Sequence, residues 1–154
     1  MGQKKLNYNR LVDLVCLILL VGVILYLIIM WNSFPDRIPG HYNAAGEIDR
    51  MGSKYELFIV PVVAWLMFLG ISAIEKYPEV WNTGVTVTEE NKGRVYRVIR
   101  NMLSTLKIIM VAVFVFLSVN SSLSTPLPIW FTPSYIILIF GTLILFIIRL
   151  IQVK

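Results

Sequence analysis

The sequence predicts an all-α fold: a polytopic membrane protein with four transmembrane helices and a structured, outward-facing loop after the first. Three observations indicate this class. Hydrophobic residues make up 57% of the 154 residues and charged residues 15%, where soluble domains average roughly 45–50% and about 25%. The mean hydropathy is +0.74. The apolar residues lie in long runs, and a helix that crosses a bilayer needs roughly 20 of them.

Each apolar run is expected to be helical, because the bilayer core offers no water to backbone groups. The expected spans are residues 11–31, 55–74, 102–119 and 134–151. The first run is longer than the apolar part of a signal peptide and no small-residue cleavage site follows it, so we expect a retained anchor. Pro61 is expected to kink the second helix, and Pro133 to stop helix before the fourth.

The connection at residues 75–101 is basic and is expected to contain the start of the third helix. Thr86 and Glu89 have the spacing of a capping box, which predicts a helix that begins near Glu89. The basic segment 92–100 has two interpretations. It binds a cytoplasmic protein or anionic lipid, or it is only the positive charge that cytoplasmic segments usually carry.

The distribution of lysine and arginine predicts the orientation in the membrane. Ten of the 14 lie at the N-terminus, in the 75–101 connection and at the C-terminus, whereas three lie in residues 32–54. Cytoplasmic segments carry the excess of basic residues. Both termini are therefore expected in the cytoplasm and residues 32–54 outside. The net charge of +5 is then explained by the orientation in the membrane and does not indicate an acidic partner.

The composition excludes several functional classes. Intrinsic disorder, a collagen-like repeat and nucleic-acid binding do not fit a chain this apolar. The single cysteine, Cys16, can form neither an internal disulfide nor a cysteine-based zinc site. The partner that the composition itself predicts is the lipid bilayer.

The segment at residues 34–54 is longer than two neighbouring spans need as a connection. Pro35 and Pro39 fix the backbone at two places, and the glycines that follow them allow tight turns. The segment also holds His41, which is the only histidine of the chain. A loop that is stiffened in this way is expected to hold side chains in place. The candidate ligand-binding residues are Pro35, Pro39, His41, Asn43, Gly46, Glu47, Asp49 and Lys54.

This pattern, directly after an apolar helix, resembles the domain of unknown function 1648, which is found at the front of SdpI-like membrane proteins of Gram-positive bacteria. The residues that carry the resemblance are Pro35, Ile38, Pro39, His41, Asn43, Gly46, Asp49 and Lys54. The resemblance implies a multi-pass protein of a bacterial cell membrane. It divides the chain into residues 1–54, a helix with the motif loop, and residues 55–154, three further helices. SdpI itself gives immunity against a secreted peptide and takes part in signalling, so the resemblance implies a role of this kind.

Several interpretations of the loop remain open. His41 orders the loop through hydrogen bonds, binds a ligand or senses pH, or takes part in catalysis, because imidazole changes its charge near neutral pH. Together with Glu47 and Asp49 it supplies the donor atoms of a zinc-type site, although the spacing matches no metal motif. The alternative is a local charge network in which the two carboxylates pair with the loop's arginines or with Lys54. The Asn43 turn is either a binding turn or plain turn chemistry.

Two charged residues lie inside the expected spans. Asp13 and Lys107 are both expected near a cytoplasmic helix end, where they snorkel or pair across the first and third helices. Charges within a membrane also mark proton or ion pathways.

The leading hypothesis is a non-enzymatic SdpI-like envelope protein whose loop recognises a secreted peptide or a lipid-linked ligand, in immunity or sensing. One alternative is a membrane-embedded hydrolase or transferase that acts on envelope material with His41 and Asp49 or Glu47. The other is an accessory subunit or small transporter that works through Asp13 and Lys107. No recognised catalytic, phosphate-binding or metalloprotease motif occurs, so no catalytic residue, metal or cofactor is predicted.

Overall fold

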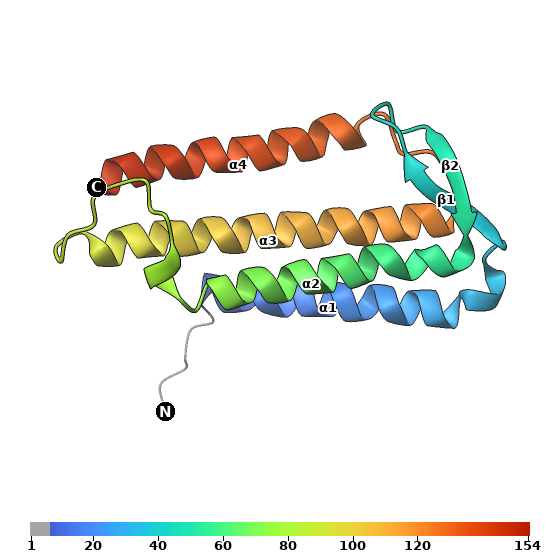
Figure 1. The fold of residues 1–154 in the computed structure, drawn as a ribbon, viewed down its shortest axis with the longest axis horizontal. Coiled ribbons are helices and arrows are strands. Elements are labelled where there is room, and N and C mark those ends of the chain that lie inside the picture. The colour runs from blue at the N-terminus through green and yellow to red at the C-terminus, as the bar shows by residue number, and fades with distance from the viewer. Residues whose placement is uncertain (1–6) are drawn as a thin grey trace.

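The computed structural model describes residues 7–154, which form four helices running alternately up and down, with a β-hairpin at one end (Figure 1). The elements are α1 (Tyr8–Ile29), η1 (Trp31–Ser33), β1 (Arg37–Tyr42), β2 (Ile48–Ser53), η2 (Lys54–Phe58), α2 (Ile59–Ile74), η3 (Pro78–Val80), α3 (Lys92–Ser122) and α4 (Phe131–Val153), where η marks a short 3₁₀ helix. The start of α1 and the end of α4 lie at the same end, which we call the termini end. The opposite end, covered by β1 and β2, is the hairpin end.

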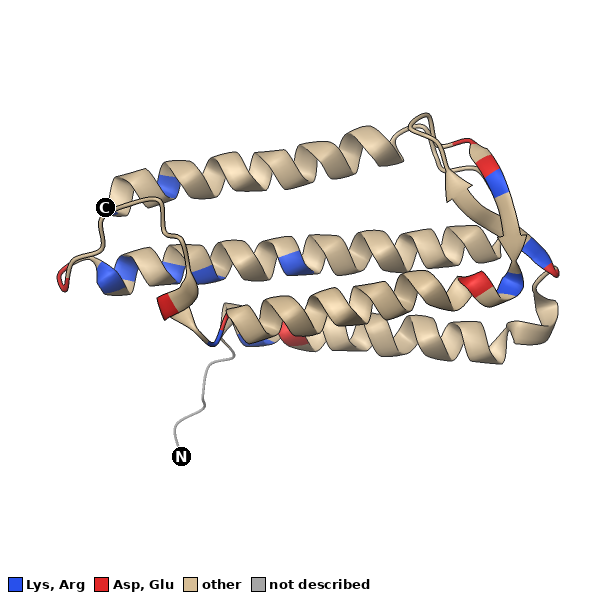
Figure 2. Cartoon of the chain, viewed as in Figure 1, with Lys and Arg blue, Asp and Glu red and all other residues tan. Residues whose placement is uncertain are grey.

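Within residues 7–154, four helical stretches are long and apolar enough to cross a membrane, as the sequence predicted. They are Tyr8–Ile29, Lys54–Ile74, Lys92–Ser122 and Phe131–Val153. Figure 2 shows that the basic residues gather at the termini end and on the hairpin, with few between them. The expectation of an all-α fold was wrong in one respect, because the segment after α1 forms a two-stranded antiparallel sheet.

The helix starts differ from the sequence predictions. Pro61 lies in the first turn of α2 and Pro133 in the first turn of α4, where a missing backbone N–H costs no hydrogen bond, so neither residue kinks or stops a helix. The capping box at Thr86 is not formed either, and α3 begins at Lys92. A capping box forms instead at Ser53, whose backbone N–H donates to Glu56 at the start of η2.

The main core lies between α1, α2 and α3. Its buried residues are Val12, Cys16, Leu20, Ala64, Phe68 and Val111. α4 is different, because among its residues, all of them described, only Phe131 in the first turn is buried. The ring of Phe131 stacks on Phe116 of α3 with 4.6 Å between the centroids. α4 therefore packs mainly on α3 and adds little to the core between the other helices.

A second apolar cluster fixes the hairpin on the bundle. Leu27 from α1, Phe34, Ile38 from β1 and Leu57 are all buried and pack together. An isolated two-stranded hairpin is marginally stable in water. The contact of Ile38 with this cluster explains why the hairpin folds, and it sets which face of β1 is directed at the helices.

Candidate ligand-binding site

The hairpin places His41 between two irregularities of the strand pairing. His41 pairs with Arg50 of β2. The register shifts once between Pro39 and His41 and again between His41 and Tyr42. Such bulges bend a strand and redirect its side chains. At the tip, Asn43 Oδ1 accepts hydrogen bonds from the backbone N–H groups of Ala45 and Glu47, both at 3.0 Å. The Asn43 segment thus forms the turn that the sequence indicated.

Hydrogen bonds attach the hairpin to the end of α3. Ser121 Oγ donates to the carbonyl oxygen of Pro39 at 2.5 Å, and Asn120 Nδ2 donates to the Tyr42 hydroxyl at 3.1 Å. The Tyr42 hydroxyl donates in turn to the carbonyl of Thr125 at 3.2 Å. Burial raises the pKa of Tyr42 above its ordinary value of 10.0, against the opposing effect of its hydrogen bonds.

Gly46 joins the hairpin tip to the connection between α3 and α4. Its carbonyl accepts a hydrogen bond from the Leu127 backbone N–H at 2.8 Å. Its φ of 85° lies in the left-handed region, and a Cβ atom there would stand 3.0 Å from Leu127 Cβ. Both facts favour glycine at this position.

The charged groups of the hairpin pair differently from the predicted network. Asp49 accepts from His41 Nδ1 at 2.7 Å, and Glu47 accepts from Asn43 Nδ2 at 2.8 Å. The described residues contain no group of three histidine, cysteine or acidic side chains placed to hold a metal ion. The zinc-type alternative therefore has no geometric support within residues 7–154.

The basic side chains of the hairpin pair with acidic residues that the sequence interpretation did not use. Arg50 Nη2 lies 2.8 Å from Glu56 Oε2, and this hydrogen bond raises the pKa of the guanidinium. Lys54 lies 3.3 Å from Asp36 and 5.0 Å from the centre of the Trp31 ring. These pairs stabilise the base of the hairpin, whereas the polar contacts nearer its tip are those of His41 and Asn43.

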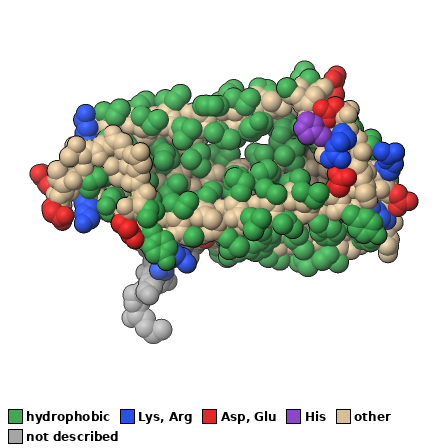
Figure 3. All heavy atoms as spheres, in the orientation of Figure 1, with side chains coloured by type: hydrophobic (Ala, Val, Ile, Leu, Met, Phe, Trp, Pro, Cys, Tyr) green, Lys and Arg blue, Asp and Glu red, His purple; other side chains and the backbone are tan. Residues whose placement is uncertain are grey.

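A cavity of about 670 Å³ lies under the hairpin, between α3 and α4. Figure 3 shows this hollow below α4, with the only histidine (purple) at its hairpin end. The hairpin contributes residues 39–44 to the wall, and the helices contribute mostly apolar side chains. The helical lining includes Met110, Phe114, Leu117, Thr132, Tyr135 and Ile139.

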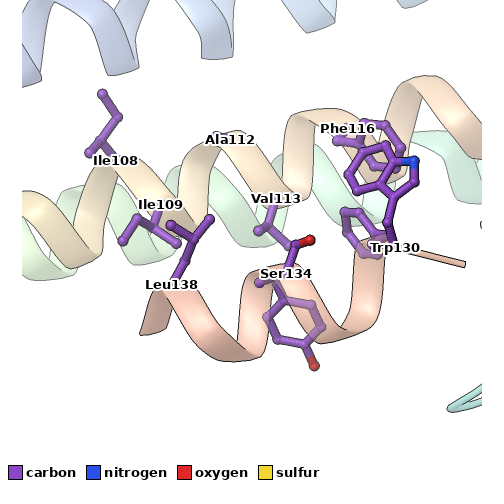
Figure 4. A pocket seen from close by; sticks show the side chains of 10 residues that line it. Ile108, Ile109, Ala112, Val113, Phe116, Trp130, Ser134 and Leu138 are labelled. Carbon is purple, nitrogen blue, oxygen red and sulfur yellow. The ribbon is translucent and has the colours of Figure 1, made fainter. Parts of the chain in front are cut away.

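A second groove of about 330 Å³ lies on the opposite face of the α3–α4 pair (Figure 4). It is lined by apolar side chains such as Ile109, Phe116 and Leu138, and the hairpin does not reach it. The two cavities differ because only the first is capped by the polar groups of the hairpin. The one under the hairpin meets both apolar and polar groups, whereas the other meets little besides hydrocarbon.

The structure brings together only part of the predicted site. Pro39, His41 and Asn43 line the cavity. The other candidates support it from outside: Gly46 and Glu47 shape the turn, Asp49 holds His41, Lys54 fixes the base of the hairpin, and Pro35 is exposed before β1. The helical side of the cavity was missed, because its residues look like ordinary membrane-facing positions in the sequence.

The intramembrane charges form a separate cluster toward the termini end. Lys107 is fully buried, so the expectation that it snorkels was wrong. Its Nζ lies 2.5 Å from Asp13 Oδ1, which is the predicted pair, and 2.7 Å from Glu75 Oε2. Ser104 Oγ donates to the second oxygen of Glu75 at 2.8 Å. Glu75 was missed; as the first acidic residue after the second apolar run, it could have been expected at the same membrane side as Asp13.

Comparisons with known proteins place the hairpin in a family. Residues 18–64, from the middle of α1 through the hairpin into α2, match the family of a domain of unknown function (DUF1648). The chain is 31% identical over 134 residues to an uncharacterized protein of Archaeoglobus fulgidus, and the match covers 75% of this chain and 71% of the relative. No solved structure matches it. The chain therefore belongs to the same family as this archaeal protein, and it carries the DUF1648 domain.

Proposed function

We propose that the chain is a non-enzymatic membrane protein that binds an amphiphilic, lipid-tailed ligand in the cavity under the hairpin. The observation that carries the proposal is the cavity itself. About 670 Å³ of space is bounded by apolar side chains of α3 and α4 and capped by residues 39–44. Ligand sites combine a mostly apolar wall with a few placed polar groups. The apolar tail lies between the helices, and the polar group meets the cap.

The polar groups of the cavity favour a ligand rich in hydroxyl groups. His41 Nδ1 is engaged by Asp49, so a neutral imidazole keeps its hydrogen on Nδ1 and offers Nε2 as an acceptor. The side chains of Thr132 and Tyr135 also line the cavity, and no hydrogen bond within residues 7–154 engages their hydroxyls. These groups suit the hydroxyls of a sugar or glycerol headgroup.

The biological role that we propose follows the SdpI-like resemblance: sensing of, or immunity against, a ligand at the outer face of a bacterial cell membrane. In this proposal both termini lie in the cytoplasm and the hairpin lies outside. The excess of basic residues at the termini end supports that orientation. A lipid-linked ligand fits the cavity better than a secreted peptide, because most of the wall lies at membrane depth between two helices.

Photo-crosslinking tests the binding function. The protein is placed in nanodiscs that contain a glucosyl diacylglycerol with a diazirine in its acyl tail, and crosslinked residues are identified by mass spectrometry. We expect crosslinks concentrated at Met110, Phe114 and Ile139. His41→Ala should lower their yield several-fold, whereas Met51→Ala, an exposed change on β2 outside the cavity, should not. Crosslinks spread uniformly over the lipid-facing residues of all four helices would contradict a specific site.

One observation favours an enzyme as the second candidate. A histidine hydrogen-bonded to a carboxylate, as His41 is to Asp49 at 2.7 Å, is the arrangement of an oriented general base. This alternative predicts that the purified protein releases glucose or fatty acid from the same glycolipid, and that His41→Ala and Asp49→Asn both abolish the release. Binding without release supports the first proposal and counts against the second.

A further inference from the structure

A polar cavity of about 390 Å³ lies at the termini end, far from the hairpin, between the first turn of α1 and the first three turns of α3. The side chains that matter in its lining are Tyr8, Asn9, Tyr96, Arg97, Arg100 and Asn101. Among residues 7–154, no acidic residue lines it. The cavity thus presents two guanidinium groups together with neutral hydrogen-bonding groups.

The two arginines differ in how they are held. Arg100 Nη2 donates to the backbone carbonyl of Glu75 at 3.4 Å, and its guanidinium lies 5.9 Å from the centre of the Trp81 ring. Arg97 is exposed and forms no ion pair with any residue from 7 to 154. Among the described residues neither arginine forms an ion pair with Glu75, whose two carboxylate oxygens accept hydrogen bonds from Lys107 and Ser104. The positive charge of the cavity is therefore available to an anion.

The cavity lies at the depth of lipid headgroups. α3 has 31 residues. At about 1.5 Å per residue it is about 46 Å long, against a hydrocarbon core of about 30 Å. Its apolar part begins after Asn101, so the turns with Arg97 and Arg100 extend beyond the core. Basic pockets between transmembrane helices at this depth bind anionic lipid headgroups.

We propose that this cavity binds the phosphate group of an anionic membrane lipid, with Arg97 and Arg100 as its cationic contacts and Asn9 and Asn101 as neutral ones. Guanidinium groups suit phosphate because they donate two parallel hydrogen bonds. A cytoplasmic protein with an acidic segment fits less well, since the cavity lies between two membrane helices at headgroup depth. The site is independent of the ligand proposed at the hairpin end.

Lipid retention in nanodiscs tests this site. Wild-type protein is compared in phosphatidylcholine alone, in phosphatidylcholine with phosphatidylglycerol, and in phosphatidylcholine with inorganic phosphate in the buffer. Native mass spectrometry counts retained lipid, and thermal unfolding measures stabilisation. We expect phosphatidylglycerol to be retained and to raise the unfolding midpoint, and inorganic phosphate to have little effect. Arg97→Gln should weaken retention about tenfold, the loss of one charged hydrogen bond.

Arg94→Gln is the matched control, because it removes the same charge from the same helix at an exposed position outside the cavity. It should change retention less than twofold. Equal losses in the two variants would show that surface charge alone attracts the lipid, and would overturn the site. Equal stabilisation by inorganic phosphate would overturn the lipid as the ligand. Neither result depends on the cavity under the hairpin, so the two proposals fail separately.

Discussion

Three helices meet at one ammonium group. Lys107 from α3 contacts Asp13 of α1 and Glu75, which directly follows α2, and it also donates to Ser72 of α2 at 3.2 Å. Glu75 is almost fully buried, whereas 40% of the Asp13 side chain is exposed. The cost of breaking such a cluster is dominated by the group that stays buried without its partner.

Removing Lys107 should therefore cost more than removing Asp13. We expect Lys107→Met to lower the free energy of unfolding in detergent by about 3 kcal/mol, since it leaves Glu75 unpaired. Asp13→Asn should cost about 1 kcal/mol, as polar contacts between membrane helices do. Adding Glu75→Gln to Lys107→Met should recover part of the loss. Arg149→Gln, which removes an exposed cation of α4, is the control, and a loss no larger for Lys107→Met would refute this account.

Two glycines have a left-handed backbone, and substituting each of them distinguishes the cost of backbone strain from the cost of a packing clash. Gly46 and Gly84 have φ of 85° and 66°, but of the two only Gly46 would bring an added Cβ atom within 4 Å of a neighbour, which is Leu127. We expect Gly84→Ala to cost about 1 kcal/mol from strain alone. Gly46→Ala should cost about 2 kcal/mol, because the Leu127 contact adds to it. Chemical denaturation measures both; equal costs would mean that the hairpin tip is not packed on the 123–130 connection.

At the scale of elements, the hairpin was only half predictable. The Asn43–Gly46 turn and the stiffening prolines could be read from the sequence. The strands could not, because Pro39 lies inside β1 and two register shifts interrupt the alternation of buried and exposed residues. The same holds for the ion pairs. Arg50 pairs with Glu56, which lies just beyond the 34–54 segment, and Lys54 pairs with Asp36, which the sequence interpretation did not use.

The attachment of the hairpin to α3 should weaken at alkaline pH. Burial raises the folded-state pKa of Tyr42 above 10.0, so folded protein holds this proton more strongly than unfolded protein. The stabilisation is complete below about pH 10 and is lost as the pH rises through the folded-state pKa. We expect the unfolding midpoint of the wild type to fall as the pH is raised from about 9 to about 11. Tyr42→Phe should start lower and fall less, and an identical fall in both proteins would contradict the assignment to Tyr42.

For the whole molecule, hydropathy predicted four membrane helices and their order, and the fold has them. It did not predict that α4 stands apart from the core. A side chain that faces lipid and one that faces a cavity are equally apolar, so the sequence pattern does not distinguish them. The cavity follows from this separation, with the hairpin closing one end of it.

The orientation of the whole molecule can be tested by labelling. Single cysteines at Ala44 on the hairpin and at Thr83 in the connection before α3 are introduced with Cys16→Ala. An impermeant thiol reagent on intact cells should label the Ala44 position and not the Thr83 position, because the basic residues gather at the termini end. Labelling at Thr83 alone would reverse the orientation.

The most direct test of the proposed function is to fill the cavity. Leu117 lines the cavity under the hairpin, and Leu138 lines only the groove on the opposite face. Leu117→Trp and Leu138→Trp add the same volume to the same helix pair. In the photo-crosslinking assay with the diazirine-tailed glucosyl diacylglycerol, Leu117→Trp should reduce labelling of Met110 and Ile139 at least tenfold, and Leu138→Trp should leave it within twofold of wild type. Unchanged labelling in Leu117→Trp, in protein that remains folded, would contradict binding in this cavity.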